Sequence, residues 1–227
     1  MSDEVRQLLE GVLLVVGSLF PIINPLGNAP LFLALTQEHT DAERRILARK
    51  VALNGFLLLL GAIFAGNSIL AFFGVSIPIV QLAGGLVVAS LAWKRLNDSG
   101  EQPRATAQAA ATVDATEAKA FYPLTLPLTV GPGAISVAIT IGANFPSTVQ
   151  PFVSDAISAV IGAFIVCVVT WISFGYADRL TRYLGPAGLA VVLRLSAFIL
   201  LCIGVQIMWN GADALFGFSK GLHPAAP

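Results

Sequence analysis

Long apolar runs separated by short polar turns dominate this chain. A helix needs about 20 apolar residues to cross a hydrocarbon core about 30 Å thick. The runs long enough to do so predict six membrane spans, at about 8–36, 51–73, 77–95, 119–143, 152–176 and 187–216. We therefore expect an all-α, polytopic membrane protein whose 227 residues form a single membrane domain.

The main polar stretch, residues 96–118, has no apolar periodicity and the composition of a cytoplasmic linker. It separates a first three-helix repeat, 1–95, from a second, 119–227. Because three crossings is an odd number, the second half runs through the bilayer in the opposite sense, as inverted-topology repeats require. Each half also reads as a broken helix, a plain helix, a short turn and a further helix. Apolar helices align easily by chance, so residue similarity between the halves is weak evidence for a repeat. The shared order of elements is the stronger evidence.

Composition agrees with a membrane location. Hydrophobic residues make up 56% of the chain and charged residues 11%, against about 25% charged in soluble domains. The formal net charge is zero, which argues against a nucleic-acid partner. Both cysteines, Cys167 and Cys202, fall in apolar runs without metal-ligating neighbours, so we interpret them as small buried hydrophobes. We expect no cofactor and no metal, and the lipid bilayer as the surroundings.

Basic residues predict the orientation. Ten of them fall on one side of the predicted map, and they are Arg44, Arg45, Arg49, Lys50, Lys94, Arg95, Arg104, Lys119, Arg179 and Arg182. The opposite side carries Arg6 and Lys220. Because positive loops stay in the cytoplasm, we expect both termini outside a bacterial inner membrane, with Gln37 and Gln108 on the cytoplasmic side.

Proline and glycine interrupt two of the predicted spans, at 24–36 (NPLGNAPLFLALT) and 123–136 (PLTLPLTVGPGAIS). Pro25 forces the residue before it away from helical dihedrals, and Pro30 suits the first turn of a new half-helix. The second break predicts a half-helix that begins near Gly133. In lipid, a helix can break only where the freed backbone groups are buried or line a polar cavity. A matched pair of breaks therefore indicates the substrate site of a secondary transporter.

Neutral polar side chains and glycines surround both breaks. A helix N-terminus carries about +0.5 elementary charge and attracts a carboxylate. A small zwitterion would fit a site of this kind, whose predicted substrate-binding residues are Asn24, Pro25, Gly27, Asn28, Thr125, Thr129, Gly131, Gly133 and Ser136. The alternative is that proline only kinks these helices and that the hydroxyls cap the freed carbonyls.

The two motifs NPLGNAPLFLALT and FYPLTLPLTVGPGAIS together resemble the MarC family of six-helix bacterial and archaeal inner-membrane proteins. The resemblance covers nearly the whole chain. It implies a fold related to the LysE-type exporters, both termini outside and, as in some members, transport of neutral amino acids such as glycine and alanine. The residues that match the family's motifs are Asn24, Pro25, Gly27, Pro30, Pro123, Pro127, Gly131, Pro132, Gly133 and Ile135. Thr125 departs from the family's pattern, where a smaller apolar residue is common.

Further polar residues lie inside or at the ends of the later spans. Arg194 falls within the last span, where it is either functional or extends its guanidinium to the interface. With Gln81 and Gln206 it forms a candidate set for gating or coupling. The acidic residues Asp155, Asp178 and Asp213 lie close to predicted helix ends, where we expect solvated or capping roles.

The leading hypothesis is a secondary transporter of small neutral amino acids that works by alternating access, coupled to Na⁺ or H⁺. Its partners would be a small-molecule substrate and the bilayer, and it could assemble as a homo-oligomer. The alternatives are a passive channel, an exporter of another small metabolite, or a membrane component without transport activity. We do not expect an enzyme, because the chain carries no G-x-S-x-G nucleophile, His-rich metal set or paired membrane carboxylates.

Overall fold

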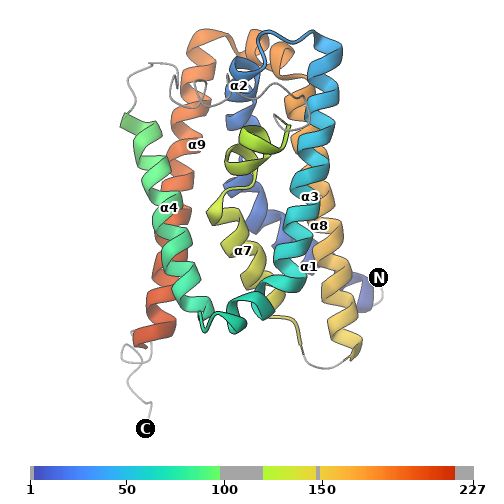
Figure 1. The fold of residues 1–227 in the computed structure, drawn as a ribbon, viewed down its shortest axis with the longest axis vertical. Helices are drawn as coiled ribbons and strands as arrows, with labels where there is room; N and C mark the ends of the chain where they lie inside the picture. Colours follow the sequence, from blue (N-terminus) through green and yellow to red (C-terminus); the bar gives the residue numbers. More distant parts are fainter. Residues whose placement is uncertain (1–2, 98–119, 147–148, 218–227) are drawn as a thin grey trace.

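The computed structural model describes residues 3–97, 120–146 and 149–217, and these contain helices and no strand. Figure 1 shows the fold along the chain. Its elements are α1 (Asp3–Ile23), α2 (Pro25–Leu35), α3 (Asp41–Phe72), α4 (Ile77–Asn97), η1 (Ala120–Thr129), α7 (Pro132–Ala143), α8 (Val149–Gly175) and α9 (Ala177–Phe216). Most of the predicted linker, from residue 98 on, and Gln108 lie outside the described residues.

The described helices match the predicted spans in order and approximate position. Five are long and apolar enough to cross a membrane, and a sixth span results if the bent pair η1 and α7 is counted as one. The helix α3 begins ten residues before the predicted span because Thr40 and Glu43 form a capping box in the polar loop. The helix α9 includes a break at Gly185, whose φ of 64° separates a short amphipathic start from the apolar span Ala187–Phe216.

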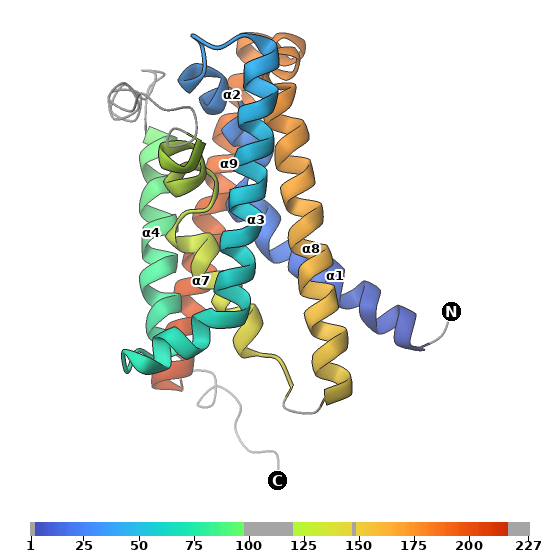
Figure 2. The ribbon, with the colours of Figure 1, turned by 45° about the vertical axis from the view of Figure 1, so that its right-hand side comes forward.

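The helices α4 and α9 lie side by side at one edge of the bundle, while α1, α3, α7 and α8 form the rest (Figures 1 and 2). Glycines allow the backbones of α4 and α9 to approach closely. A Cβ added at Gly85 would lie 2.6 Å from the Gly204 carbonyl oxygen, and one at Gly204 would lie 2.6 Å from the Ala89 nitrogen. Close contact through small residues is the usual way for membrane helices to pack, so α4 and α9 form one tightly packed pair.

Two buried apolar clusters fill the remaining bundle. The central core joins α1, α3, α7 and α8, and its largest buried members include Leu19, Ile23, Leu59, Ile63, Val130 and Val166. The second cluster joins α2, α3, η1 and α8 through Phe32, Leu47, Val51, Leu124, Leu128 and Phe174. We name it the basic-end core, because it lies at the end of the bundle where α3 begins with its basic residues. The rings of Phe32 and Phe174 stack with centroids 4.5 Å apart, and neither is exposed. This end of the bundle is therefore closed by dense packing.

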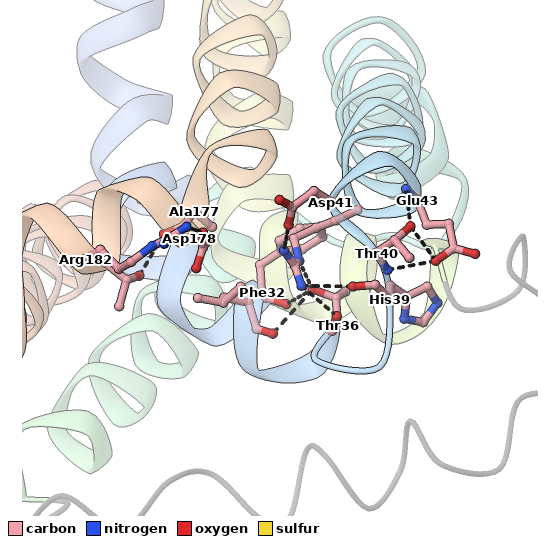
Figure 3. A network of polar contacts seen from close by, with 12 residues as sticks. Phe32, Thr36, His39, Thr40, Asp41, Glu43, Ala177, Asp178 and Arg182 are labelled. Carbon is pink, nitrogen blue, oxygen red and sulfur yellow. Dashed lines mark hydrogen bonds and ion pairs between the residues drawn. The ribbon is translucent and has the colours of Figure 1, made fainter.

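Polar contacts hold the loop between α2 and α3 against the basic-end core. Arg44 is only 8% exposed and donates hydrogen bonds to the carbonyl oxygen of His39 at 3.1 Å and to Oγ1 of Thr36 at 3.3 Å. It also pairs with Asp41 at 2.7 Å. Figure 3 shows this network together with the Thr40 and Glu43 capping box. A buried arginine with several acceptors makes this loop a firm cover, since removing its partners would leave a buried charge unpaired.

Large apolar side chains face outward on many helices, as expected where lipid replaces water. Cys167 is buried, as expected, but the expectation was wrong for Cys202, which is exposed on α9. The reason is geometric: an apolar run in a membrane helix has both a protein-facing and a lipid-facing side, so hydrophobicity alone does not predict burial.

Candidate functional site

The first break is an interruption of the helical dihedrals at a single residue, Asn24, within the span Glu4–Leu35. Its φ of 48° and ψ of 60° place it in the left-handed region, which asparagine tolerates better than most residues. Its Oδ1 accepts a hydrogen bond from the Gly27 nitrogen at 3.1 Å and so caps the N-terminus of α2. A Cβ at Gly27 would lie 2.3 Å from Nδ2 of Asn24, which explains the glycine. The half-helix starts at Pro25, so the expectation that Pro30 opens it was wrong.

The second break is sharper. The helix η1 has non-helical dihedrals at Tyr122 and Leu126, and its axis makes an angle of 71° with that of α7. Gly131 is the extended N-cap of α7, and Pro132 occupies the first turn, where its missing N–H costs nothing. The predicted half-helix start near Gly133 is therefore confirmed.

Asn28 connects the two breaks. Its side-chain Nδ2 donates to the Ile23 carbonyl oxygen at 2.8 Å, at the end of α1, and to the Leu128 carbonyl oxygen at 3.1 Å, in η1. Both carbonyls belong to interrupted backbone that needs a donor away from water. The side chain is 2% exposed, and its Oδ1 has no hydrogen-bond partner among the described residues. The junction of the breaks thus holds one unused, buried acceptor.

The other residues predicted at the breaks are occupied by the protein itself. The hydroxyls of Thr125 and Thr129 each donate at 2.7 Å to a backbone carbonyl five residues earlier, and Ser136 donates at 3.0 Å to the Val80 carbonyl of α4. These contacts agree with the alternative interpretation of the sequence, in which the hydroxyls cap backbone carbonyls instead of binding a substrate. A Cβ on Gly133 would meet Cγ2 of Val88 at 1.9 Å, so this glycine accommodates α4. Pro25 is buried at the start of α2.

A cavity of about 490 Å³ lies next to the breaks, between α1, α4, α7, α8 and α9. Neutral polar side chains reach it from four of these helices, namely Ser18, Gln81, Thr140, Asn144, Gln206 and Asn210. The remaining helix, α8, contributes Asp155 and Ser158. Apolar residues and the glycines Gly11 and Gly17 complete the wall. This mixture is typical of a small-molecule site.

The cavity and the breaks are adjacent but distinct. Ile22 lines the cavity, and the next residue supplies the Ile23 carbonyl that Asn28 binds. The predicted substrate-binding residues of the breaks are absent from the described cavity wall. The cavity is lined by the C-terminal ends of α7 and α9 and the N-terminal part of α8, which lie at the end of the bundle nearer the chain's N-terminus, whereas α2 of the basic-end core lies at the opposite end (Figure 2).

The three candidate gating residues divide between two environments. Gln81 and Gln206 both line the cavity, where Gln81 donates to Oγ1 of Thr140 at 3.3 Å and Gln206 donates to Oδ1 of Asn210 at 2.8 Å. Arg194 is exposed on α9 between the exposed Leu193 and Leu195, away from the described cavity wall.

Asp155 and Ser158 are two of the wall residues that the sequence interpretation did not assign to a site, and the others include Ser18, Thr140 and Asn144. Asp155 is the seventh residue of α8, too far along the helix to cap it, and it faces the cavity. Asp178, in contrast, forms an ion pair with Arg182 one turn later (Figure 3). The sequence did contain a signal for this part of the wall. Asp155 is an acidic residue inside an apolar span, and Ser158 follows it three positions later, so both lie on one helix face. The described residues contain no group of three or more His, Cys, Asp or Glu able to hold a metal ion.

Comparison with known proteins places these motifs in context. The chain matches the MarC family of integral membrane proteins over residues 9–216. The UPF0056 inner membrane protein MarC of Escherichia coli O1:K1 is 33% identical over 199 residues, which cover 85% of this chain and 90% of the relative. A UPF0056 membrane protein of Buchnera aphidicola is 30% identical over 199 residues, with 88% and 90% covered. No solved structure matches the chain.

The double contact of Asn28 predicts a large effect on stability. Asn28→Ala should lower the apparent melting temperature of the purified protein in detergent, because the Ile23 and Leu128 carbonyls lose their donor at a cost of about 1–3 kcal/mol each. Asn28→Asp, which keeps the shape but loses the donor, should be destabilised as well. Asn97→Ala is the matched control, since Asn97 is exposed and donates only to the Trp93 carbonyl. An Asn28→Ala protein that melts with the parent would exclude this role.

Proposed function

This chain belongs to the MarC family of integral membrane proteins, and we propose that it is a secondary transporter of small neutral amino acids of the glycine and alanine type. It would work in a bacterial inner membrane by alternating access, without chemistry on the substrate. Its E. coli relatives carry the name of inner membrane proteins, and this chain has five apolar helices and one bent pair of membrane-spanning length.

The observation that carries the proposal is a cavity that lies beside the joined breaks, although the predicted substrate-binding residues of the breaks do not line it. The cavity extends to Ile22, next to the carbonyl that Asn28 binds, and the Oδ1 of Asn28 remains buried and unpartnered. A buried acceptor without a donor costs free energy, so a ligand that donates a hydrogen bond to it would be favoured. In secondary transporters, broken helices near the bilayer midplane form the substrate and ion sites.

The cavity wall favours a small, neutral substrate. A volume of about 490 Å³ is within the range of about 300–1,000 Å³ that is usual for small-molecule sites. Amide and hydroxyl groups offer hydrogen bonds to both ends of a zwitterion, and Asp155 is the one ionisable residue among the described wall residues, which include no lysine or arginine. Gly17 leaves open space at the wall, since a Cβ there would meet no atom within 4 Å, whereas a Cβ at Gly11 would lie 2.7 Å from Oγ of Ser158.

Two packed bodies border the cavity and suggest the moving parts. The helix pair α4 and α9 supplies Gln81, Gln206 and Asn210, and the rest of the bundle supplies α1, α7 and α8. Because α4 and α9 touch through their backbones, they would move together. Rocking of this pair against the remaining helices would close the cavity at one end and open the basic-end core at the other.

The helix contacts support the two inverted repeats that we propose for this motion. If α1, α2, α3 and α4 correspond to η1, α7, α8 and α9, the contacts should occur in matching pairs, and the more extensive ones do, while the smaller contact of α1 with α9 has no counterpart of similar extent. The pairs α1 with α8 and η1 with α3 correspond in this way, as do α2 with α9 and α7 with α4. The pairs α3 with α8 and α4 with α9 are their own counterparts, and both are extensive. Two similar states of opposite orientation follow from such symmetry.

Orientation is open to a direct test. We expect Gln37→Cys to react with an impermeant maleimide only from the cytoplasmic side, and Ser76→Cys only from outside, because the exposed Gln37 is at the basic end and the exposed Ser76 at the other. The background should replace the two native cysteines by alanine. Labelling of Gln37→Cys in intact cells would reverse the proposed topology.

The function itself is tested by uptake of radiolabelled glycine and alanine into proteoliposomes. We expect saturable uptake by the parent and a loss of at least about ten-fold in Gly17→Leu, equivalent to about 1.4 kcal/mol. Gly17 lines the cavity, and a Cβ there meets no atom within 4 Å, so the added side chain would occupy substrate space without distorting the helix.

Gly61→Leu is the matched control for the uptake test. Gly61 is an exposed glycine of α3 that also has nothing within 4 Å of an added Cβ, but it does not line the cavity. We expect its uptake to equal that of the parent. Equal uptake by a folded Gly17→Leu protein would exclude the cavity as the path, and non-saturable flux in the parent would identify a passive channel.

A further inference from the structure

Asp155 is the one ionisable side chain among the described residues that line the cavity. It lies three residues into the apolar span Phe152–Gly175 and is partly buried. It makes no hydrogen bond and no ion pair with any described residue. A carboxylate inside a membrane span is costly, and such residues face the protein interior or a water-filled cavity and mark pathways for ions or substrates.

The surroundings of Asp155 leave its charge uncompensated. Arg6, in the first turns of α1, pairs with the exposed Glu10 on its own helix at 2.9 Å. The wall residues that accompany Asp155 are neutral. A negative charge in a recess of low polarity raises the local concentration of cations.

Further residues of the same cavity wall carry oxygen atoms of the kinds that bind a cation. Ser158 lines the same cavity one turn further along α8, and its hydroxyl donates at 3.2 Å to the Leu8 carbonyl of α1, which leaves the oxygen free to accept. Asn144 and Ser18 bring an amide and a hydroxyl oxygen to the same wall. Carboxylate, hydroxyl and amide oxygens are acceptors for both alkali-metal ions and ammonium groups.

We propose that Asp155 binds a monovalent cation in this cavity, either a sodium ion or the amino group of the substrate. The inference rests on the proposed transport function and adds the residue that attracts the positive charge. The Oδ1 of Asn28 at the breaks is a neutral acceptor. Asp155 instead supplies a carboxylate to the cavity wall, farther from the breaks and closer to the end of the bundle that carries the chain's N-terminus.

Thermal unfolding of the purified protein in detergent tests this site without requiring transport. Sodium chloride is compared with N-methyl-D-glucamine chloride at equal ionic strength, and glycine is added in a separate arm. A ligand that binds only the folded state raises the melting temperature, and we expect about 2–4 °C in at least one arm for the parent. Asp155→Asn should abolish the shift, and Asp155→Glu, which keeps the charge, should retain it.

Glu10→Gln is the matched control, because it removes an exposed carboxylate at the same end of the bundle that does not line the cavity. A shift with sodium alone that Asp155→Asn loses identifies an inorganic cation, and a shift only with glycine identifies the amino group. An unchanged shift in Asp155→Asn, or no shift in the parent with either ligand, overturns the inference. Glycine uptake by the parent then reports separately on the proposed function, which stands or fails independently.

Discussion

The need to satisfy interrupted backbone inside a membrane determines the rest of this structure. Where α1 stops at Ile23 and η1 stops before Gly131, carbonyl groups lose their helical donors in a region without water. The Asn28 amide supplies a donor to each side, and the hydroxyls of Thr125 and Thr129 satisfy carbonyls within η1. The two halves of the chain are therefore joined at the point where both are broken, and the cavity begins there.

Much of this arrangement follows from the sequence because it depends on local chemistry. Pro132 occupies the first turn of α7 without losing a bond, so the start of this half-helix is readable from the sequence. Long apolar runs predict the spans for the same reason. The start of α2 is not readable in this way, because Pro25 and Pro30 both suit a first turn and only the folded chain shows that the helix begins at Pro25. The choice between a substrate contact and a backbone contact for Ser136 or Thr129 is different, because it depends on which carbonyl lies within reach after the helices pack.

The cavity could not be predicted in this way, since it is formed by five helices that meet only in the folded chain. Asp155 of α8 and Gln206 of α9 lie about fifty residues apart in sequence but line the same cavity. The glycines of α4 and α9 determine how closely these two helices pack against each other. Their effect cannot be predicted from the sequence before the partner helix is known. Gln81 and Gln206 were nevertheless singled out, because an amide in an apolar span needs a polar neighbour.

In the proposed motion, the α4 and α9 pair rocks against the other helices. Distance measurement by double electron–electron resonance tests this motion most directly. Spin labels at Phe152 and Leu215 span the cavity end, and labels at Ala42 and Asn97 span the basic end, all at exposed positions. The account predicts that alanine shifts the first distance distribution to shorter values and the second to longer values. Two distributions that stay unchanged while alanine is transported would contradict it.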